Sequence, residues 1–311
     1  GLDSLVPDVL LVIVGHFSSL QLAGVAAGNS IFWMIVMIGF GLLHGMDPIV
    51  AQAHGAGDIE QAERCLGSAL KMGFIFSLIF TPLIYLISEN LWILGAPDDV
   101  IQAAQPFLRT LGFSLWPLMI YGAFARYWQG FEIALPFTLT IIAANFVNWV
   151  GNLALVSGRW GWPAYGAQGA AFSTTICRIF TLVAAVGISF YYWRKMHPKP
   201  WQHLWQILKR KDSEMNRRLF NLGLPASGQI LLEVFAFSFT TIMVTHLGAQ
   251  TLATHHIILN IASFAFMFPV GLSSAIAVRV GYHLGRHQPE KAFRAGWQGI
   301  IFAFVFMSFS A

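Results

Sequence analysis

Charged residues are scarce in this sequence. Asp, Glu, Lys and Arg make up 10% of its 311 residues, whereas a soluble globular protein carries about 25%. Hydrophobic residues account for 56% and include 27 Phe and 11 Trp. This composition excludes an ordinary soluble domain and predicts an all-α polytopic membrane protein.

Cysteine is also scarce, since Cys65 and Cys177 are the only two. Two cysteines predict neither a disulfide framework nor a cysteine-rich metal site. The sequence lacks a basic stretch ahead of its first apolar segment, so we predict no cleavable signal peptide. It begins without Met and ends within an apolar segment, and we therefore expect a fragment that lacks both ends of a longer protein.

The basic residues are unevenly distributed. The formal net charge is +4, and eight of the 18 Lys and Arg lie within residues 194–218, between two hydrophobic spans. Trp201 and Trp205 stand among them, which is typical of an amphipathic connector on a membrane surface. We therefore expect a lipid bilayer as partner and no nucleic acid.

Hydrophobic windows predict nine membrane spans, the last of them incomplete. They lie near residues 1–17, 22–53, 66–88, 100–128, 133–156, 167–193, 219–243, 251–284 and 296–311. Loops after even-numbered spans carry nearly all of the loop Lys and Arg. The positive-inside rule therefore predicts that the N-terminus and the 194–218 connector are cytoplasmic.

The sequence repeats itself at an offset of 230 residues. Residues 14–64 match residues 244–294 at thirteen identical positions, among them the pair Gly55 and Gly285. Six spans separate the copies, so both copies cross the membrane in the same direction, as in transporters built from parallel repeats. We predict a first lobe at 1–193 with six spans, a basic connector at 194–218, and a second lobe at 219–311 with about three of six spans.

Glu233 is the leading candidate for function. It lies in the apolar stretch Gly223–Gly248, where a carboxylate is costly unless it faces a polar cavity or a cation. We expect the helix to begin near Pro225 and to place Glu233 roughly 12 Å below its end. The alternative is a purely structural pairing with a neighbouring helix. At the 230-residue offset the counterpart of Glu233 is Asp3.

Asp8 and three asparagines are further candidates for ion coupling. Asp8 follows Pro7, and this pair either marks a cation-binding bend or lies at a helix start. Asn145, Asn148 and Asn152 share one helix face. Such a polar stripe can supply oxygen ligands to sodium or join two helices by hydrogen bonds.

Asp47 and His44 lie late in the second predicted span, just before Pro48. We expect a bend at Pro48. Asp47 and His44 either form a gate network with Gln52 and His54 or lie at a water-solvated helix end.

Three residues of the second half are candidates for the cleft. His255 and Asn260 lack the acid or cysteine that a zinc site would need, so packing or hydrogen bonding is expected. Phe237 belongs to a set of aromatic residues that mainly pack in the membrane, although some can contact flat cationic compounds. We predict no cofactor or structural metal; Na+ or H+ is the expected coupling ion.

Several motifs together resemble the multidrug and toxin extrusion (MATE) family in its bacterial NorM-like branch. They are LAGVAAGNS at 22–30, GLLHGMDPIVAQAHGAGD at 41–58, NFVNWVGN at 145–152, GLPASGQILLEVFAF at 223–237, and the long segment at 252–285. The resemblance implies twelve helices in two lobes and the exchange of cationic or amphipathic drugs for Na+ or H+ by alternating access. It also implies a non-enzymatic, monomeric, multi-pass protein of the bacterial inner membrane.

The resemblance assigns roles to particular residues. Glu233 matches the coupling acid of helix 7, and Asn148 and Asn152 match a polar pair of helix 5. The usual acid of helix 1 falls on Leu10, so the resemblance leaves Asp8 or Asp3 as its replacement.

Two alternatives to drug export follow from other features. A lipid-linked oligosaccharide flippase of related fold would need a cationic cleft, for which the spans offer Arg109, Arg126 and Arg178. A membrane-embedded prenyl-diphosphate transferase would need paired acidic motifs, and only Asp98 and Asp99 are adjacent acids in a loop.

Overall fold

The computed structural model describes residues 19–94, 98–158, 161–245 and 249–310. Asp3 and Asp8 lie outside these residues, so the two predictions made for them stay predictions. The described residues form α-helices joined by short turns and one 3-10 turn, with no β-strand among them. Seven of their helical stretches are long and apolar enough to cross a membrane. The predicted all-α fold is confirmed.

The helices follow the predicted spans in order. The first half contains α2 (Ser19–His44), α3 (Met46–Ala56), α4 (Ile59–Glu89), α5 (Asp98–Gly112), α6 (Leu115–Gly130), α7 (Leu135–Leu155) and α8 (Gly166–Met196). The 3-10 turn η2 (Leu91–Leu94) precedes α5, and α9 (Pro200–Lys209) lies in the connector. The second half contains α10 (Ser213–Thr245), α11 (Ala249–Gly285) and α12 (Pro289–Ser310).

Two predicted spans are interrupted, and each interruption lies just upstream of a proline. Proline has no N–H for the carbonyl four residues earlier. The break between α2 and α3 falls at Gly45, directly after His44. Pro48 has no N–H to donate to the His44 carbonyl. The break between α5 and α6 falls at Phe113 and Ser114, with Pro117 following. The bend expected at Pro48 therefore lies three residues earlier.

The start predicted for the Glu233 helix is wrong. Helix α10 begins at Ser213 and contains Pro225 in its interior. At 1.5 Å per residue, Glu233 lies about 30 Å along α10 instead of two turns from its end. The Asp212 carboxylate accepts a 2.9 Å hydrogen bond from the Met215 backbone N–H and so caps the earlier start.

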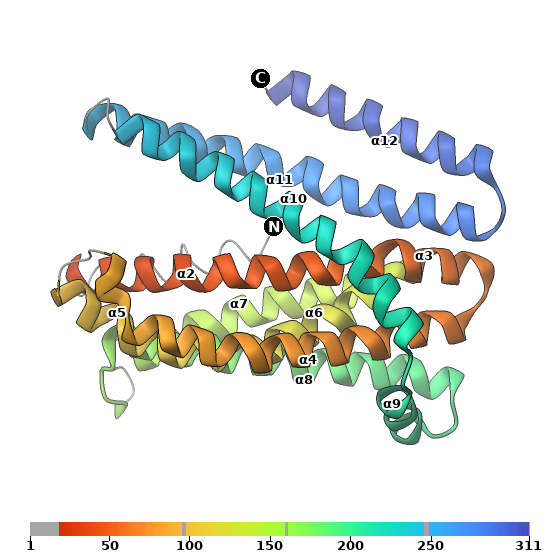
Figure 1. Cartoon of the computed structure of the whole chain (residues 1–311), viewed down its shortest axis with the longest axis horizontal. Helices are drawn as coiled ribbons and strands as arrows, with labels where there is room; N and C mark the ends of the chain where they lie inside the picture. The colour runs from red at the N-terminus through yellow and green to blue at the C-terminus, as the bar shows by residue number, and fades with distance from the viewer. Residues whose placement is uncertain (1–18, 95–97, 159–160, 246–248, 311) are drawn as a thin grey trace.

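The two halves form separate layers in Figure 1, with α10, α11 and α12 on one side of the α2–α8 bundle. The first bundle has a continuous core that includes the fully buried Phe32, Leu66, Trp128 and Trp193. Most side chains of the second layer are exposed. The connector links the layers, with Trp201 and Trp205 exposed and Ile207 buried against α4.

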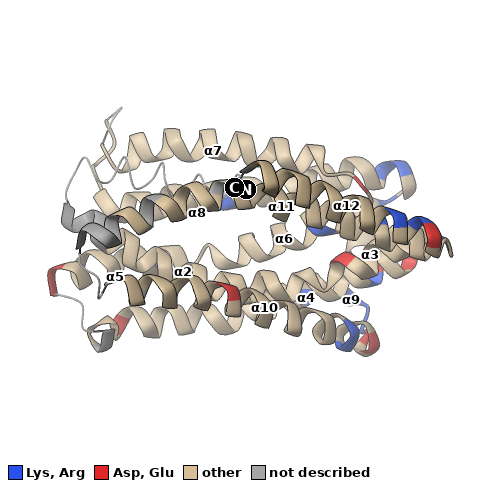
Figure 2. Cartoon of the chain, turned by 90° about the horizontal axis from the view of Figure 1, so that it is seen from above, with Lys and Arg blue, Asp and Glu red and all other residues tan. Residues whose placement is uncertain are grey.

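Charged residues gather at one end of the molecule in Figure 2, around α3, α9 and the start of α12. We call this the basic end; it carries Arg64, the connector, Arg286, Lys291 and Arg294. These are the loop Lys and Arg residues from which the positive-inside rule predicts that this end is cytoplasmic.

Candidate functional site

The side chain of Glu233 is exposed on α10. Among the residues that the structure describes, no hydrogen bond or ion pair involves its carboxylate. A structural pairing of Glu233 with a described basic residue is therefore not seen.

Helix α10 packs tightly against α2 before it reaches Glu233. A β-carbon placed on Gly223 would lie 2.3 Å from the carbonyl oxygen of Leu42, and one on Gly41 would lie 2.3 Å from the Ser227 α-carbon. The buried Ser227 hydroxyl donates to the carbonyl oxygen of Ile38 at 2.9 Å. Only glycine permits backbones to approach this closely.

Helix α11 makes a second tight contact, with α3. A β-carbon on Gly285 would lie 2.0 Å from the carbonyl oxygen of Gln52, and one on Gly55 would lie 2.0 Å from that of Tyr282. Residues 52 and 55 correspond to 282 and 285 at the 230-residue offset. The contact is thus symmetric between the repeats, as in an isologous interface around a two-fold axis.

Both helix contacts lie toward the basic end, and two polar contacts reinforce the attachment there. The Gln129 amide donates to the Ser274 hydroxyl at 2.7 Å, and Arg279 pairs with Glu132 at 3.2 Å. Beyond Ser227, residues 232–240 of α10 are all exposed. The second layer is therefore held to the first bundle mainly at one end.

The other second-half candidates lie away from that contact. Phe237 and Asn260 are exposed, and His255 is half-buried with its Nε2 3.4 Å from the Thr241 hydroxyl. The structure does not bring Asn260 together with Glu233 through any described hydrogen bond.

Asn148 and Asn152 are buried between α7 and α8. The Asn152 amide donates to Oδ1 of Asn148 at 3.0 Å, and the Ser173 hydroxyl donates to the Asn148 carbonyl at 3.0 Å. The predicted role as a hydrogen-bonded seam between helices has a direct structural counterpart. Oδ1 of Asn152 is buried without a hydrogen-bond partner in the described part of the chain, so one oxygen of this seam remains available to a cation or water.

One of the two interpretations expected Asp47 to be water-solvated, and the structure shows that it is not. Its carboxylate accepts a 2.7 Å hydrogen bond from Arg126, and both side chains are mostly buried. Arg126 also donates to Nε2 of His44 at 2.8 Å, while Nδ1 of His44 donates to the Phe40 carbonyl at 2.8 Å. Arg126 thus links Asp47 to His44, whereas Gln52 and His54 lie outside this network. His54 donates to the Gly130 carbonyl, and Gln52 lines an open cavity between α3 and α10.

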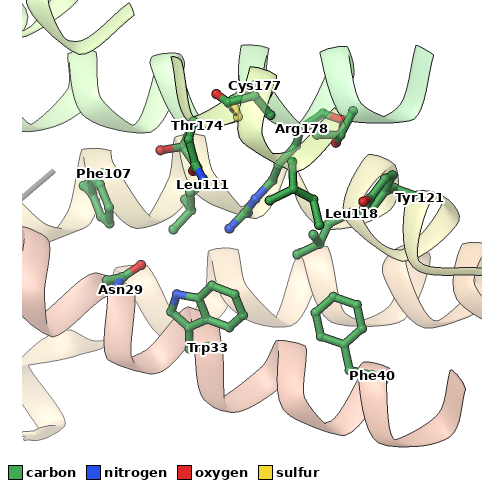
Figure 3. Close-up of a pocket in the computed structure, with 14 residues that line it drawn as sticks. Asn29, Trp33, Phe40, Phe107, Leu111, Leu118, Tyr121, Thr174, Cys177 and Arg178 are labelled. Atoms are coloured by element: carbon green, nitrogen blue, oxygen red, sulfur yellow. Dashed lines mark hydrogen bonds between the residues drawn. The ribbon is translucent and has the colours of Figure 1, made fainter. Parts of the chain in front are cut away.

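A cavity lies within the first bundle between α2, α5, α6, α7 and α8. Figure 3 shows its wall of aromatic and apolar side chains, with Trp33 and Phe40 from α2 facing Leu111, Leu118 and Tyr121. A mainly apolar and aromatic lining with a few polar groups is typical of a small-molecule site.

Arg178 brings a positive charge to this cavity. It is buried, donates to the Ser114 hydroxyl, and lies 4.4 Å from the centre of the Phe32 ring. A lone basic residue within an apolar span is a sequence signal for such a cavity. The aromatic lining was not predicted, because neighbouring helices supply it.

The flippase alternative gains no cationic cleft from the remaining arginines. Arg109 pairs with Glu89, and Arg126 pairs with Asp47. Asp98 and Asp99 occupy the exposed first turn of α5, where acids stabilise a helix N-terminus. These arrangements favour neither the flippase nor the transferase.

The membrane-crossing helices and the repeat-related contact define a multi-pass helical membrane protein built from two bundles. The chain belongs to the MatE family, whose model matches residues 3–154 and 225–311. The resemblance inferred from the motifs is therefore confirmed.

Relatives and solved structures agree with this assignment. The chain is 31% identical to a probable multidrug resistance protein NorM of Bradyrhizobium diazoefficiens over 92% of the chain and 60% of the relative. It is 28% identical to one of Xylella fastidiosa over 95% and 62%. It thus spans less than two thirds of their length.

Two solved structures share the fold. The eukaryotic MATE transporter AtDTX14 superposes with a TM-score of 0.80 at 20% identity, over 96% of this chain and 65% of that one. A MOP superfamily transporter from Pyrococcus furiosus superposes with a TM-score of 0.83 at 19% identity, over 98% and 66%.

Proposed function

We propose that this protein belongs to a cation-coupled antiporter that exports cationic or amphipathic compounds by alternating access. The observation that carries the proposal is the Glu233 carboxylate, which lies in a membrane span without a described basic partner. Uptake of Na+ or H+ there would neutralise a costly charge and favour one arrangement of the two halves. The relatives named as multidrug resistance proteins support export of small molecules.

The contacts at the basic end support alternating access. The symmetric glycine contact of α3 with α11 and the glycine contact of α2 with α10 hold the halves together at that end, while α10 is exposed beyond them. With the basic end in the cytoplasm, this arrangement corresponds to closure on the cytoplasmic side. The opposite arrangement would require separation of α3 from α11 and of α2 from α10.

We assign the binding of a positively charged substrate group to Glu233 and not to the cavity of the first bundle. Arg178 repels a cation from that cavity, whereas its aromatic wall accommodates flat apolar groups. A cationic substrate and the coupling ion would then compete for Glu233, which is the exchange that antiport requires.

The test is ethidium efflux from vesicles with reconstituted protein under an imposed Na+ or pH gradient. We expect Glu233→Gln to abolish gradient-driven efflux with normal insertion. Glu214→Gln is the matched control, because Glu214 is an exposed acid in the first turn of the same helix. Efflux at the wild-type rate in Glu233→Gln would refute the assignment.

A further inference from the structure

Three side chains with metal-binding atoms meet at the basic end, away from Glu233. Glu63 lies in the second turn of α4, His197 follows α8 directly, and His203 lies in α9. Nε2 of His197 and Nε2 of His203 lie 2.9 and 2.8 Å from the same oxygen, Oε1 of Glu63. All three ligand atoms lie within 4.8 Å of one another.

The chain segment between the two histidines fixes their placement. His197 and His203 are six residues apart, so they would not share a face of one helix. The segment HPKPWQH carries Pro198 and Pro200, and it turns so that the imidazole rings stack with centroids 3.7 Å apart. The buried Trp193 packs edge-on against His203 at 5.8 Å. Two imidazole nitrogens thus converge on one point.

Glu63 brings an acidic group to a largely buried position. The residue is 8% exposed, and a buried carboxylate needs a positive partner. The neighbouring basic residues are engaged elsewhere, because Arg64 pairs with Asp212 and Arg210 pairs with Glu60. A divalent cation placed between the three ligand atoms would balance the carboxylate.

We propose that Glu63, His197 and His203 bind a divalent transition-metal ion of the Zn2+ type. Two imidazole nitrogens and one carboxylate oxygen form a donor set that Zn2+ uses with a water as fourth ligand. An open cavity borders His203 and Glu63 and gives the ion access from water. The bound ion ties the connector to α4 and to the end of α8, at the base of the second half.

The experiment measures metal binding by the protein purified in detergent without a histidine tag and stripped with a chelator. We expect one equivalent of Zn2+ to bind in competition with a fluorescent chelator and to raise the thermal midpoint. His203→Gln and His197→Gln should each weaken binding by more than about 100-fold, since losing even an outer-shell partner costs 10–100-fold. His287→Asn is the control, because His287 is exposed with φ 56°, a conformation that asparagine tolerates.

A measurement on the unmodified protein avoids dependence on the folding of variants. One equivalent of Co2+ should give the visible absorption of a low-coordinate site and be displaced by Zn2+. Absence of stoichiometric binding would overturn the proposal. So would unchanged affinity in His203→Gln, which would place the ion elsewhere.

Discussion

Gly285 and Gln52 approach so closely that a β-carbon on Gly285 would lie 2.0 Å from the carbonyl oxygen of Gln52. The repeat-related pair, Gly55 and Tyr282, shows the same approach at 2.0 Å. A side chain at either glycine must therefore push α3 and α11 apart. The symmetric pair acts as a single close contact between the two halves.

Gly285→Ala should separate α3 from α11 and destabilise the protein by about 1–3 kcal/mol, as overpacking of a tight contact does. Thermal unfolding in detergent measures this change. Gly271→Ala in the same helix is the control, because a β-carbon there meets nothing within 4 Å. It should be neutral or stabilise by up to about 1 kcal/mol through helix propensity. Equal midpoints for both variants would show that the contact does not hold the halves together.

The mostly buried pair of Asp47 and Arg126 should contribute more than an exposed pair. A double-mutant cycle with Asp47→Asn and Arg126→Gln should give a coupling of about 1.5–3 kcal/mol, as for hydrogen bonds to charged groups. Glu60 and Arg210 form the control pair, with side chains 69% and 47% exposed, and should couple by less than about 1 kcal/mol. A coupling for the Asp47 pair no larger than that of the control would contradict this prediction.

Asp212 should make stability depend on pH in the acid range. The hydrogen bond from Arg64 lowers the pKa of the Asp212 carboxyl below its ordinary value. The ionised form is thus favoured in the folded state, and its contribution is complete above the unfolded pKa of about 3.9 and is lost as pH falls through the lowered folded pKa. Asp212→Asn keeps a good helix cap but removes the charge.

Thermal midpoints recorded from neutral to acid pH test this prediction. The wild-type protein should exceed Asp212→Asn by a constant amount near neutrality, and the difference should shrink below about pH 4. A difference that is independent of pH would show that the carboxylate charge is not responsible.

The buried Asn148 should stabilise the packing of α7 on α8. Asn148→Leu removes the amide that faces Ser173 and Thr174 at 3.5 Å and should cost about 1 kcal/mol, in the range of hydrogen bonds between membrane helices. Thr138→Val is the control on an exposed face of α7, where the hydroxyl bonds only to its own helix. Comparable unfolding midpoints for the two variants would show that the seam does not join the helices.

The sequence by itself determined the features that depend on local composition. Hydropathy fixed the order and approximate bounds of the helices, since each apolar stretch must satisfy its own backbone in the membrane. The 230-residue repeat indicated two related halves, and the motifs identified the family. The start of α10 does not follow from Pro225, because the Asp212 cap and the residues after it extend the helix beyond this proline.

Only the tertiary structure decided which residues meet. Gly55 and Gly285 are identical positions of the repeat, but their placement against Tyr282 and Gln52 depends on how α3 and α11 are rotated about their own axes. The partner of Asp47 is Arg126, and that of Glu63 is a pair of histidines beyond residue 196. Such partners come from distant segments, and a hydrophobic pattern carries no information about the angle at which one helix faces another.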